Sequence, residues 1–178
     1  LNVVFGRMSR PVTLALELDD TPLSTELRGF IDALVALSGG KLKSTVDDGE
    51  YEKDDTGRAV FDVDSVLPAA RPCVRMVVDG EPTGLAFHGV PSGHEFNSFV
   101  LGLYNAAGPG QPLGDDLIER AKSIASPLNI MILVSLTCTM CPETVLASQR
   151  LASLNPAVRA EAYDVSHFPE LKDQYGAM

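Results

Sequence analysis

Basic residues are scarce in this sequence. The 178 residues include 14 Lys and Arg against 24 Asp and Glu, which gives a formal net charge of −10. Proteins that bind nucleic acids use clustered Lys and Arg side chains to replace the counterions of the phosphates, and no such cluster occurs here. This deficit argues against a nucleic-acid partner and indicates that the chain acts on other proteins.

Long apolar runs are lacking as well. The longest, such as residues 128–136, fall well short of the ~20 residues that a membrane helix requires. Residues 1–11 have neither the length nor the cleavage site of a secretory signal peptide. We therefore expect a cytoplasmic protein with no membrane partner.

Cysteine is also rare, with three residues in the chain. Cys138 and Cys141 form a C-x-x-C motif, whereas Cys73 lies inside an apolar run and is expected to be a buried, unreactive thiol. This count argues against a framework of structural disulfides and fits a redox or metal-binding pair in a reducing compartment. Zinc is disfavoured, because a structural site needs four ligands and the sequence has no second C-x-x-C and only scattered histidines.

The C-x-x-C motif lies where a predicted strand, residues 128–136, turns into a predicted helix, residues 142–154. At such a turn the sulfur of Cys138 faces unpaired backbone N–H groups and the positive end of the helix dipole, which favour the thiolate. The thiolate is the species that attacks a disulfide. We therefore predict that Cys138 is the nucleophile and that Cys141 resolves the mixed disulfide that Cys138 forms.

The first 107 residues predict the element order of a thioredoxin-like fold. Short apolar or β-branched runs bounded by turn residues indicate strands, apolar residues at helical spacing indicate helices, and Asp79-Gly80 signals a hairpin. The expected elements are strands at 12–18, 41–46, 73–78 and 85–88 and helices at 27–37 and 94–106.

The pattern restarts after a Pro- and Gly-rich joint and a short helix. The expected elements are the joint at 108–114, helices at 115–124, 142–154 and 168–175, and strands at 128–136 and 158–163. We therefore predict an α/β protein of two adjoining thioredoxin-like (glutaredoxin-like) folds with central mixed sheets. The first fold spans 1–107, a joint and helix span 108–126, and the second fold, cut short at its C-terminus, spans 127–178.

The two halves differ at the position of the motif. Aligning them places Asp20 and Leu23 where the second half has Cys138 and Cys141, so the first fold is predicted to be redox-silent. The first half also contains a strongly acidic segment, residues 47–64, which we interpret as a solvated loop rather than an acidic docking patch.

Several segments, taken with the C-x-x-C, resemble the N-terminal domain of the flavoprotein (F) subunit of bacterial alkyl hydroperoxide reductase. They are Pro11–Leu14 with Leu18–Asp20, Gly89–Phe96, Ser135–Cys138 with Cys141-Pro142, and Leu154–Pro156. The resemblance runs from about Arg10 to Met178 and implies two thioredoxin-like folds, the first without cysteines. It also implies a disulfide that takes electrons from a flavin reductase module and passes them to a peroxiredoxin, the peroxidatic subunit, in peroxide detoxification.

The resemblance further implies that Glu95 acts as an acid/base group facing the dithiol. A partly buried carboxyl with a raised pKa is suited to relaying the proton that dithiol chemistry requires. The alternative is that a glutamate in the first turn of a helix only interacts with the helix dipole. His94, which directly precedes Glu95, is expected to be a surface or capping residue. Pro72 stands at the position of a cis-proline loop in the first half.

The chain departs from this family in three respects. The acidic stretch from Asp47 to Asp64 is longer than expected for the family. Thr139-Met140 replaces a more polar pair, which changes the surroundings of the thiolate. No G-x-G-x-x-G fingerprint occurs, so FAD and NADH are expected on a downstream or separate module and not on this chain.

Two other functions stay open at this point. One is a free-standing glutaredoxin-like protein disulfide oxidoreductase, a class in which both halves often carry C-x-x-C. The other is a non-catalytic protein-docking scaffold. A homodimer is compatible with either, and with the leading hypothesis.

Overall fold

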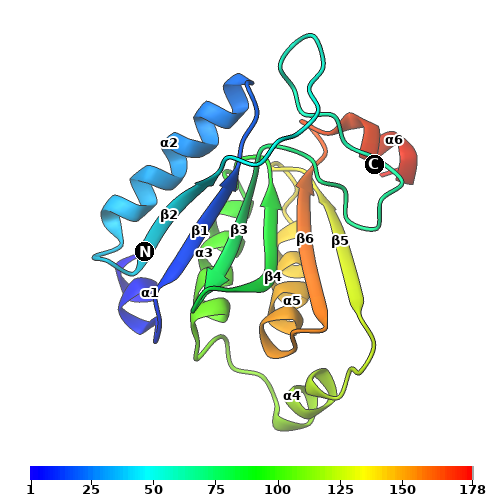
Figure 1. The fold of residues 1–178 in the computed structure, drawn as a ribbon. Helices are drawn as coiled ribbons and strands as arrows, with labels where there is room; N and C mark the ends of the chain where they lie inside the picture. The colour runs from blue at the N-terminus through cyan, green and yellow to red at the C-terminus, as the bar shows by residue number, and fades with distance from the viewer. Residues whose placement is uncertain (178) are drawn as a thin grey trace.

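Six strands form one mixed sheet in the computed structural model, which describes residues 1–177 (Figure 1). β1 is parallel to β2, β3 is antiparallel to β1 and to β4, and β4, β6 and β5 are parallel. In sheet order the strands are β2 (Leu42–Asp47), β1 (Val12–Glu17), β3 (Cys73–Val78), β4 (Glu81–His88), β6 (Val158–Asp164) and β5 (Leu128–Val134). The predicted α/β class with a mixed sheet is confirmed.

The helices lie around this sheet. They are α1 (Asn2–Arg7), α2 (Pro22–Leu37), α3 (Glu95–Ala107), α4 (Asp115–Lys122), α5 (Cys141–Leu154) and α6 (Pro169–Tyr175). Helices α3 and α5 pack against each other behind the sheet in the view of Figure 1. Most predicted bounds hold within one or two residues, while α1 was not predicted and α2 begins five residues before its first predicted apolar position.

The predicted hairpin joins β3 to β4. Asp79 and Gly80 both have positive φ, 53° and 80°, as a two-residue hairpin turn requires. Pairing begins at once, between Val78 and Glu81, so β4 starts at Glu81 and not at Leu85. The polar Glu81–Gly84 stretch, with its proline and glycine, concealed this first part of the strand from the hydrophobic pattern.

The sheet is continuous across the two predicted folds. β4 pairs with β6 from Leu85↔Ala160 to His88↔Tyr163. Residues from both halves share one apolar core, with Leu14 and Phe87 in the same cluster as Val134 and Ala160. Each half repeats a strand-helix-strand unit with parallel strands, β1-α2-β2 and β5-α5-β6. The division into 1–107, 108–126 and 127–178 stays a prediction, and Met178 lies outside the described residues.

A buried ion-pair network crosses the seam between the halves. Glu161 of β6 is fully buried and accepts hydrogen bonds from His88 of β4 (2.7 Å), Arg75 of β3 (2.7 Å), Arg159 (2.6 Å) and Tyr163 (3.2 Å). Ala160 and Ala162 belong to the main core, and side chains alternate along a strand, so Glu161 points to the opposite face of the sheet. The network therefore ties three strands together on that face.

The acidic segment docks onto the first half and onto α6. Lys53 pairs with Asp20 at 2.6 Å, and the Ala59 N–H donates to Asp19 at 2.9 Å, so the segment covers the β1–α2 turn. Arg58 pairs with Glu170 of α6 and lies over the Phe168 ring. Most of its acidic side chains are exposed, as expected of a solvated loop, but Figure 1 shows the segment reaching from β2 to α6.

Candidate active site

The dithiol motif lies at the carboxyl end of β5, where the chain turns into α5. Ser135 to Cys138 forms a tight turn, with the Cys138 N–H donating to the Ser135 carbonyl at 2.9 Å and the Ser135 and Thr137 hydroxyls 3.0 Å apart. Cys141 is the first residue of α5. This is the strand-to-helix position that the sequence predicted for the motif.

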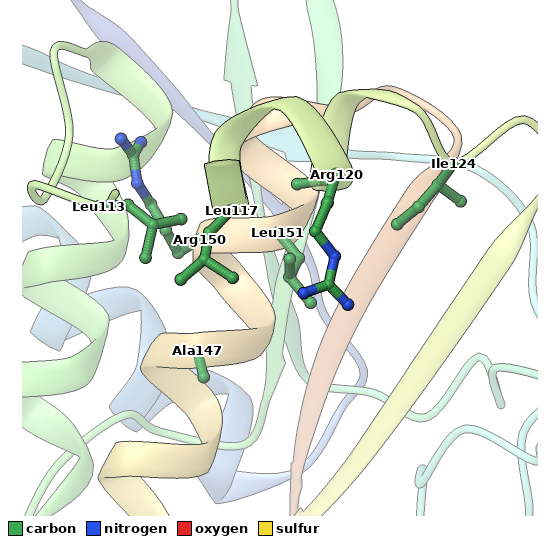
Figure 2. Close-up of a pocket in the computed structure, with 8 residues that line it drawn as sticks. Leu113, Leu117, Arg120, Ile124, Ala147, Arg150 and Leu151 are labelled. Carbon is green, nitrogen blue, oxygen red and sulfur yellow. The ribbon is translucent and has the colours of Figure 1, made fainter. Parts of the chain in front are cut away.

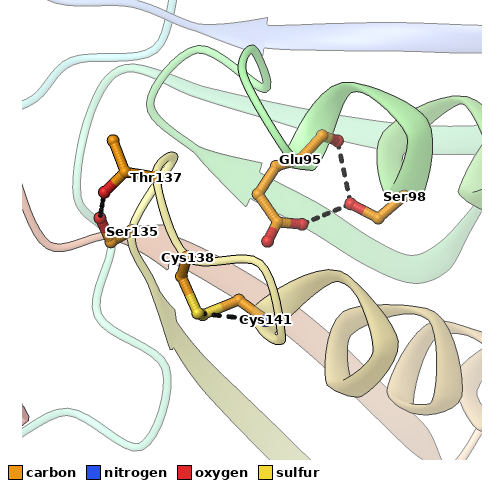
Figure 3. The surroundings of a disulfide bond; sticks show 6 residues. All are labelled: Glu95, Ser98, Ser135, Thr137, Cys138 and Cys141. Carbon is orange, nitrogen blue, oxygen red and sulfur yellow. Dashed lines mark hydrogen bonds between the residues drawn. A yellow bond between two sulfur atoms is a disulfide. The ribbon is translucent and has the colours of Figure 1, made fainter.

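Cys138 and Cys141 are joined by a disulfide, with 5.6 Å between their Cα atoms (Figure 3). The backbone N–H of Cys141 donates to the Cys138 sulfur at 3.2 Å. The first N–H groups of a helix have no partner within the helix. After reduction, the same donor is in place to stabilise a Cys138 thiolate, together with the positive end of the α5 dipole.

The two sulfurs have different surroundings. Cys141 packs against the main apolar core, whereas Cys138 belongs to a turn that continues into the exposed side chains of Thr139 and Met140. Met140 is 67% exposed. A partner disulfide that approaches over this turn meets the Cys138 side of the pair.

Glu95 is the first residue of α3 and is fully buried. Its side chain points toward the segment that carries the disulfide (Figure 3). The Ser98 hydroxyl donates to Oε2, while no group within residues 1–177 bonds to Oε1. Burial raises the pKa of Glu95, and the charge of Asp164 adds to the rise, against the opposing effects of Ser98 and His94. The site thus holds a carboxyl whose protonated form is favoured beside a disulfide.

The start of α3 touches the dithiol turn directly. The His94 N–H donates to the Leu136 carbonyl at 3.1 Å. Gly93 has φ +56°, and a Cβ at that position would lie 2.7 Å from the same carbonyl oxygen. Both the backbone conformation and the close approach therefore require glycine. This contact is what brings Glu95 to the second half of the molecule.

Gly93→Ala should separate α3 from the dithiol turn. Its Cβ meets a backbone atom that cannot move aside, so we expect a loss of about 1–3 kcal/mol beyond the strain of the positive φ alone. Gly39→Ala is the matched control, because Gly39 also has φ +60° but no atom within 4 Å of the added Cβ. Urea unfolding of both variants checks this, and equal losses would contradict the contact argument.

The first half has a different arrangement at the equivalent turn, between β1 and α2. Asp19 accepts hydrogen bonds from Thr21 and from the Ser24 hydroxyl, so a carboxylate faces the start of α2. Although burial opposes it, hydrogen bonds from Ser24, Thr21 and Ala59 lower the pKa of Asp19. The Arg71-Pro72 peptide is cis, as the position of Pro72 in the first half predicted.

The remaining sequence-predicted residues lie apart from the dithiol or contribute only their backbone. Cys73 is fully buried, and burial raises the pKa of its thiol well above the usual range, in keeping with the prediction of an unreactive group. His94 is exposed and precedes α3 without a capping side-chain bond. Sequence reasoning missed Ser98, although its spacing of three residues from Glu95 on a helix was a usable signal.

Two kinds of site can be compared with the described residues: a dinucleotide-binding turn and a cluster of metal ligands. Dinucleotides bind at the glycine-rich turn between the first strand and the helix of a β-α-β unit with parallel strands. The corresponding turns of this chain, residues 18–21 and 135–140, contain no glycine, so neither allows the close backbone approach that a dinucleotide needs. Among residues 1–177, no three His, Cys, Asp or Glu side chains are grouped as metal ligands.

None of the described helices is long and apolar enough to cross a membrane.

An apolar hollow of about 450 Å³ lies between α4 and α5 (Figure 2). Leu113, Leu117, Ile124 and Leu151 line it, and it approaches α5 through residues 147–151, beyond the first turns of that helix. It contains no group of the dithiol site, and we assign it no part in the chemistry.

Comparisons with known proteins give a consistent picture, although no protein-family model matches the chain. The F subunit of alkyl hydroperoxide reductase (AhpF) of Pseudomonas aeruginosa is 31% identical over 170 residues, which are 96% of this chain and 29% of that protein. The crystal structure of the NTD_N/C domain of AhpF of Enterococcus faecalis is 37% identical. It has a TM-score of 0.81 and covers 99% of this chain and 82% of that one.

A more distant structure shares the fold. A protein disulfide oxidoreductase from Aeropyrum pernix has a TM-score of 0.75 at 20% identity, over 99% of this chain and 77% of that one. The predicted thioredoxin-like α/β fold is thereby confirmed. The chain spans less than a third of the length of the curated relatives that it matches.

Proposed function

The chain belongs to the AhpF family, the F subunits of alkyl hydroperoxide reductase, in which it matches the N-terminal domain, and from this membership we infer that it is a dithiol/disulfide electron-relay module. The resemblance read from the motifs is confirmed. In our proposal, Cys138 and Cys141 carry the electrons, and Glu95 donates and accepts a proton. The module works in the cytoplasm, reducing a peroxiredoxin with electrons from a flavin reductase module that binds FAD and NADH.

One observation carries this proposal: the Cys138–Cys141 disulfide at the start of α5 faces a buried carboxyl from the other half. The Cys141 N–H on the Cys138 sulfur supplies thiolate stabilisation. The Glu95 carboxyl supplies a proton donor and acceptor. A docking scaffold would need neither group. The silent first half argues against a free-standing oxidoreductase with two active motifs.

The proposed exchange transfers two electrons in two steps. The Cys138 thiolate attacks one sulfur of the partner disulfide and forms a mixed disulfide, while the other partner sulfur leaves as a thiolate and takes a proton from solvent. Cys141 then passes its thiol proton to the Glu95 carboxylate, which hands it on in the next step, and attacks the Cys138 sulfur. This step restores the Cys138–Cys141 disulfide and releases the second partner sulfur, which takes up the proton. A donor dithiol on the flavin reductase module reverses both steps to reload the chain.

A transfer experiment tests the proposal. The chain, reduced and freed of reductant, is mixed with an oxidised peroxiredoxin, and the free thiols of both proteins are counted over time. We expect two thiols to disappear from the chain for each peroxiredoxin disulfide that is reduced. Thiols that stay on the chain while glutathione reduces the same peroxiredoxin would contradict the assignment.

A native gel of the chain alone reports whether it is a homodimer.

Glu95→Gln tests the proton role. The change keeps the size of the side chain and an acceptor for Ser98 but removes titration, so we expect the exchange rate to fall by ~100-fold and its dependence on pH to flatten. The melting temperature should move little, since burial favours the protonated carboxyl of Glu95 and a neutral glutamine amide replaces it without a change of charge. An exchange rate equal to that of the parent from pH 5 to 9 would remove Glu95 from the site.

A further inference from the structure

An exposed methionine lies inside the dithiol motif. Met140 follows Cys138 by two residues and directly precedes Cys141, where it is the N-cap residue of α5. It is 67% exposed. Burial is what makes an apolar side chain stabilise a fold, so Met140 adds little to stability at this position, and its sulfur is accessible to reagents in solvent.

The other methionines of residues 1–177 are covered. Met8 and Met76 are each 2% exposed. Met131 is half-buried and packs against the smaller apolar cluster around Phe168. An oxidant must reach the thioether sulfur to react with it, so the reaction follows exposure. Of these four methionines, Met140 is the one that an oxidant in solvent reaches most readily.

The cysteines do not compete for an oxidant in the disulfide state. Cys138 and Cys141 are joined, so neither presents the thiolate that a peroxide attacks. Cys73 is fully buried, and burial raises the pKa of its thiol. When the dithiol is oxidised, the most accessible reactive sulfur in residues 1–177 is therefore that of Met140.

The turn around Met140 is uncharged. Residues 123–142, which contain β5 and the motif, include no Asp, Glu, Lys or Arg, although these types make up 21% of the chain. Thr137 and Thr139 are exposed beside it. The Cα atoms of Cys138 and Met140 are at most ~7 Å apart. A partner segment that reaches Cys138 therefore covers Met140 as well, and the contact that it makes there is apolar.

We propose that Met140 is an oxidation site: a hydroperoxide converts its thioether to the sulfoxide while the dithiol is in its disulfide state, and this modification slows electron transfer to a protein partner. The inference rests on the proposed function, which places the chain in a system that handles hydroperoxides. It goes beyond that function by assigning a second sulfur reaction to the same turn.

The oxidation is a two-electron step. The Met140 sulfur attacks the terminal oxygen of the hydroperoxide, so that an S–O bond forms and the O–O bond breaks. The sulfur loses two electrons, and the departing alkoxide takes the proton of the transferred oxygen and leaves as an alcohol, or as water from hydrogen peroxide. A methionine sulfoxide reductase returns the thioether with two electrons from a dithiol, so the modification is reversible.

The sulfoxide changes what a partner must bury. The thioether of Met140 is a soft apolar contact, whereas the sulfoxide oxygen is a strong hydrogen-bond acceptor. Covering such an oxygen without a donor opposes docking. We therefore expect transfer to a protein partner to slow by about tenfold, which is at the lower end of the cost of an unpaired buried acceptor.

Peptide mapping of the disulfide form tests the oxidation without any partner or turnover. The chain is treated with limiting hydrogen peroxide, and mass spectrometry follows the gain of one oxygen at each methionine. We expect Met140 to react roughly tenfold faster or more than Met8, Met76 and Met131. Fragment ions separate Met140 from Met131, because both lie in the tryptic peptide of residues 123–150. Equal rates at Met140 and at the buried methionines would overturn the assignment.

Stopped-flow transfer tests the consequence of the oxidation. Treated and untreated chains are reduced with a dithiol, freed of it and mixed with an oxidised peroxiredoxin. The rate should fall by about tenfold after treatment, and methionine sulfoxide reductase should restore it. In Met140→Leu, which keeps an apolar side chain without sulfur, the rates before and after treatment should be equal. Met131→Leu is the matched control and should lose as much on treatment as the parent.

The outcomes separate this inference from the proposed function. An unchanged rate in the treated parent, or a fall of the same size in treated Met140→Leu, would overturn the role of Met140 even if the chain reduces a peroxiredoxin. If the untreated chain does not reduce a peroxiredoxin, the proposed function fails. A disulfide-bonded peptide with apolar residues beside its cysteines then serves as the acceptor, and the same comparison of treated and untreated chains decides the role of Met140.

Discussion

Cys138→Ser is expected to reduce disulfide exchange by ~1000-fold or more, because a serine hydroxyl is not ionised at neutral pH and cannot replace the attacking thiolate. The fold should be unaffected, since Cys138 is only partly buried and does not belong to the core. Stopped-flow transfer to an oxidised peroxiredoxin measures the rate. Limiting alkylation with peptide mapping measures which thiol reacts first, and we expect Cys138.

Cys141→Ser is the matched change within the same motif. It keeps the attacking thiolate but removes the resolving thiol, so it should leave a mixed disulfide between Cys138 and the partner. Non-reducing electrophoresis and mass spectrometry detect that species. Normal turnover by Cys141→Ser, or first labelling of Cys141 or Cys73, would show that the roles of the two cysteines are reversed or that a different thiol works.

Glu161→Ala is expected to give the largest loss of stability. The change leaves His88 and Arg75 without the carboxylate that both contact at 2.7 Å, and breaking a buried charge pair from one side costs about 3–5 kcal/mol. Glu26→Ala, at an exposed position of α2, should leave the urea midpoint unchanged. If Glu161→Ala lowered the free energy of unfolding no more than Glu26→Ala does, the network would not stabilise the pairing of the two halves.

The same network predicts an acid dependence. Although burial alone would raise it, hydrogen bonds and charges from His88 and Arg75 lower the pKa of Glu161 from 4.5 to about 2. An acid whose pKa is lowered in the fold contributes stability above the unfolded value, and the contribution is lost as the pH falls through the folded value. The stability gap between the parent and Glu161→Ala should therefore close between about pH 4.5 and pH 2.

The local parts of the fold could be predicted from the sequence. The Asp79-Gly80 hairpin, the helix after the C-x-x-C and the apolar strands all depend on residues close together in the chain. Three features depend on partners more than 30 residues apart: the β4–β6 pairing, the bond between Glu161 and His88, and the docking of the acidic segment. Hydrophobic periodicity describes only neighbouring residues and cannot predict such contacts. For this reason the seam between the halves was not predicted.

The candidate site divides in the same way. Cys138 and Cys141 follow from local spacing at a strand-to-helix turn. Glu95 came from a family resemblance, since no pattern within one half shows that α3 reaches the other half.

The parallel pairing of β4 with β6 has a consequence for attempts to divide the molecule. Cutting the joint at 108–114 and separating the pieces would expose the backbone of both strands at once, along the stretch where Leu85–His88 pairs with Ala160–Tyr163. Such edges pair with other chains, so each piece is an aggregation hazard on its own. Heating the intact chain should accordingly give a single melting transition, in which the silent half and the dithiol half lose their structure together.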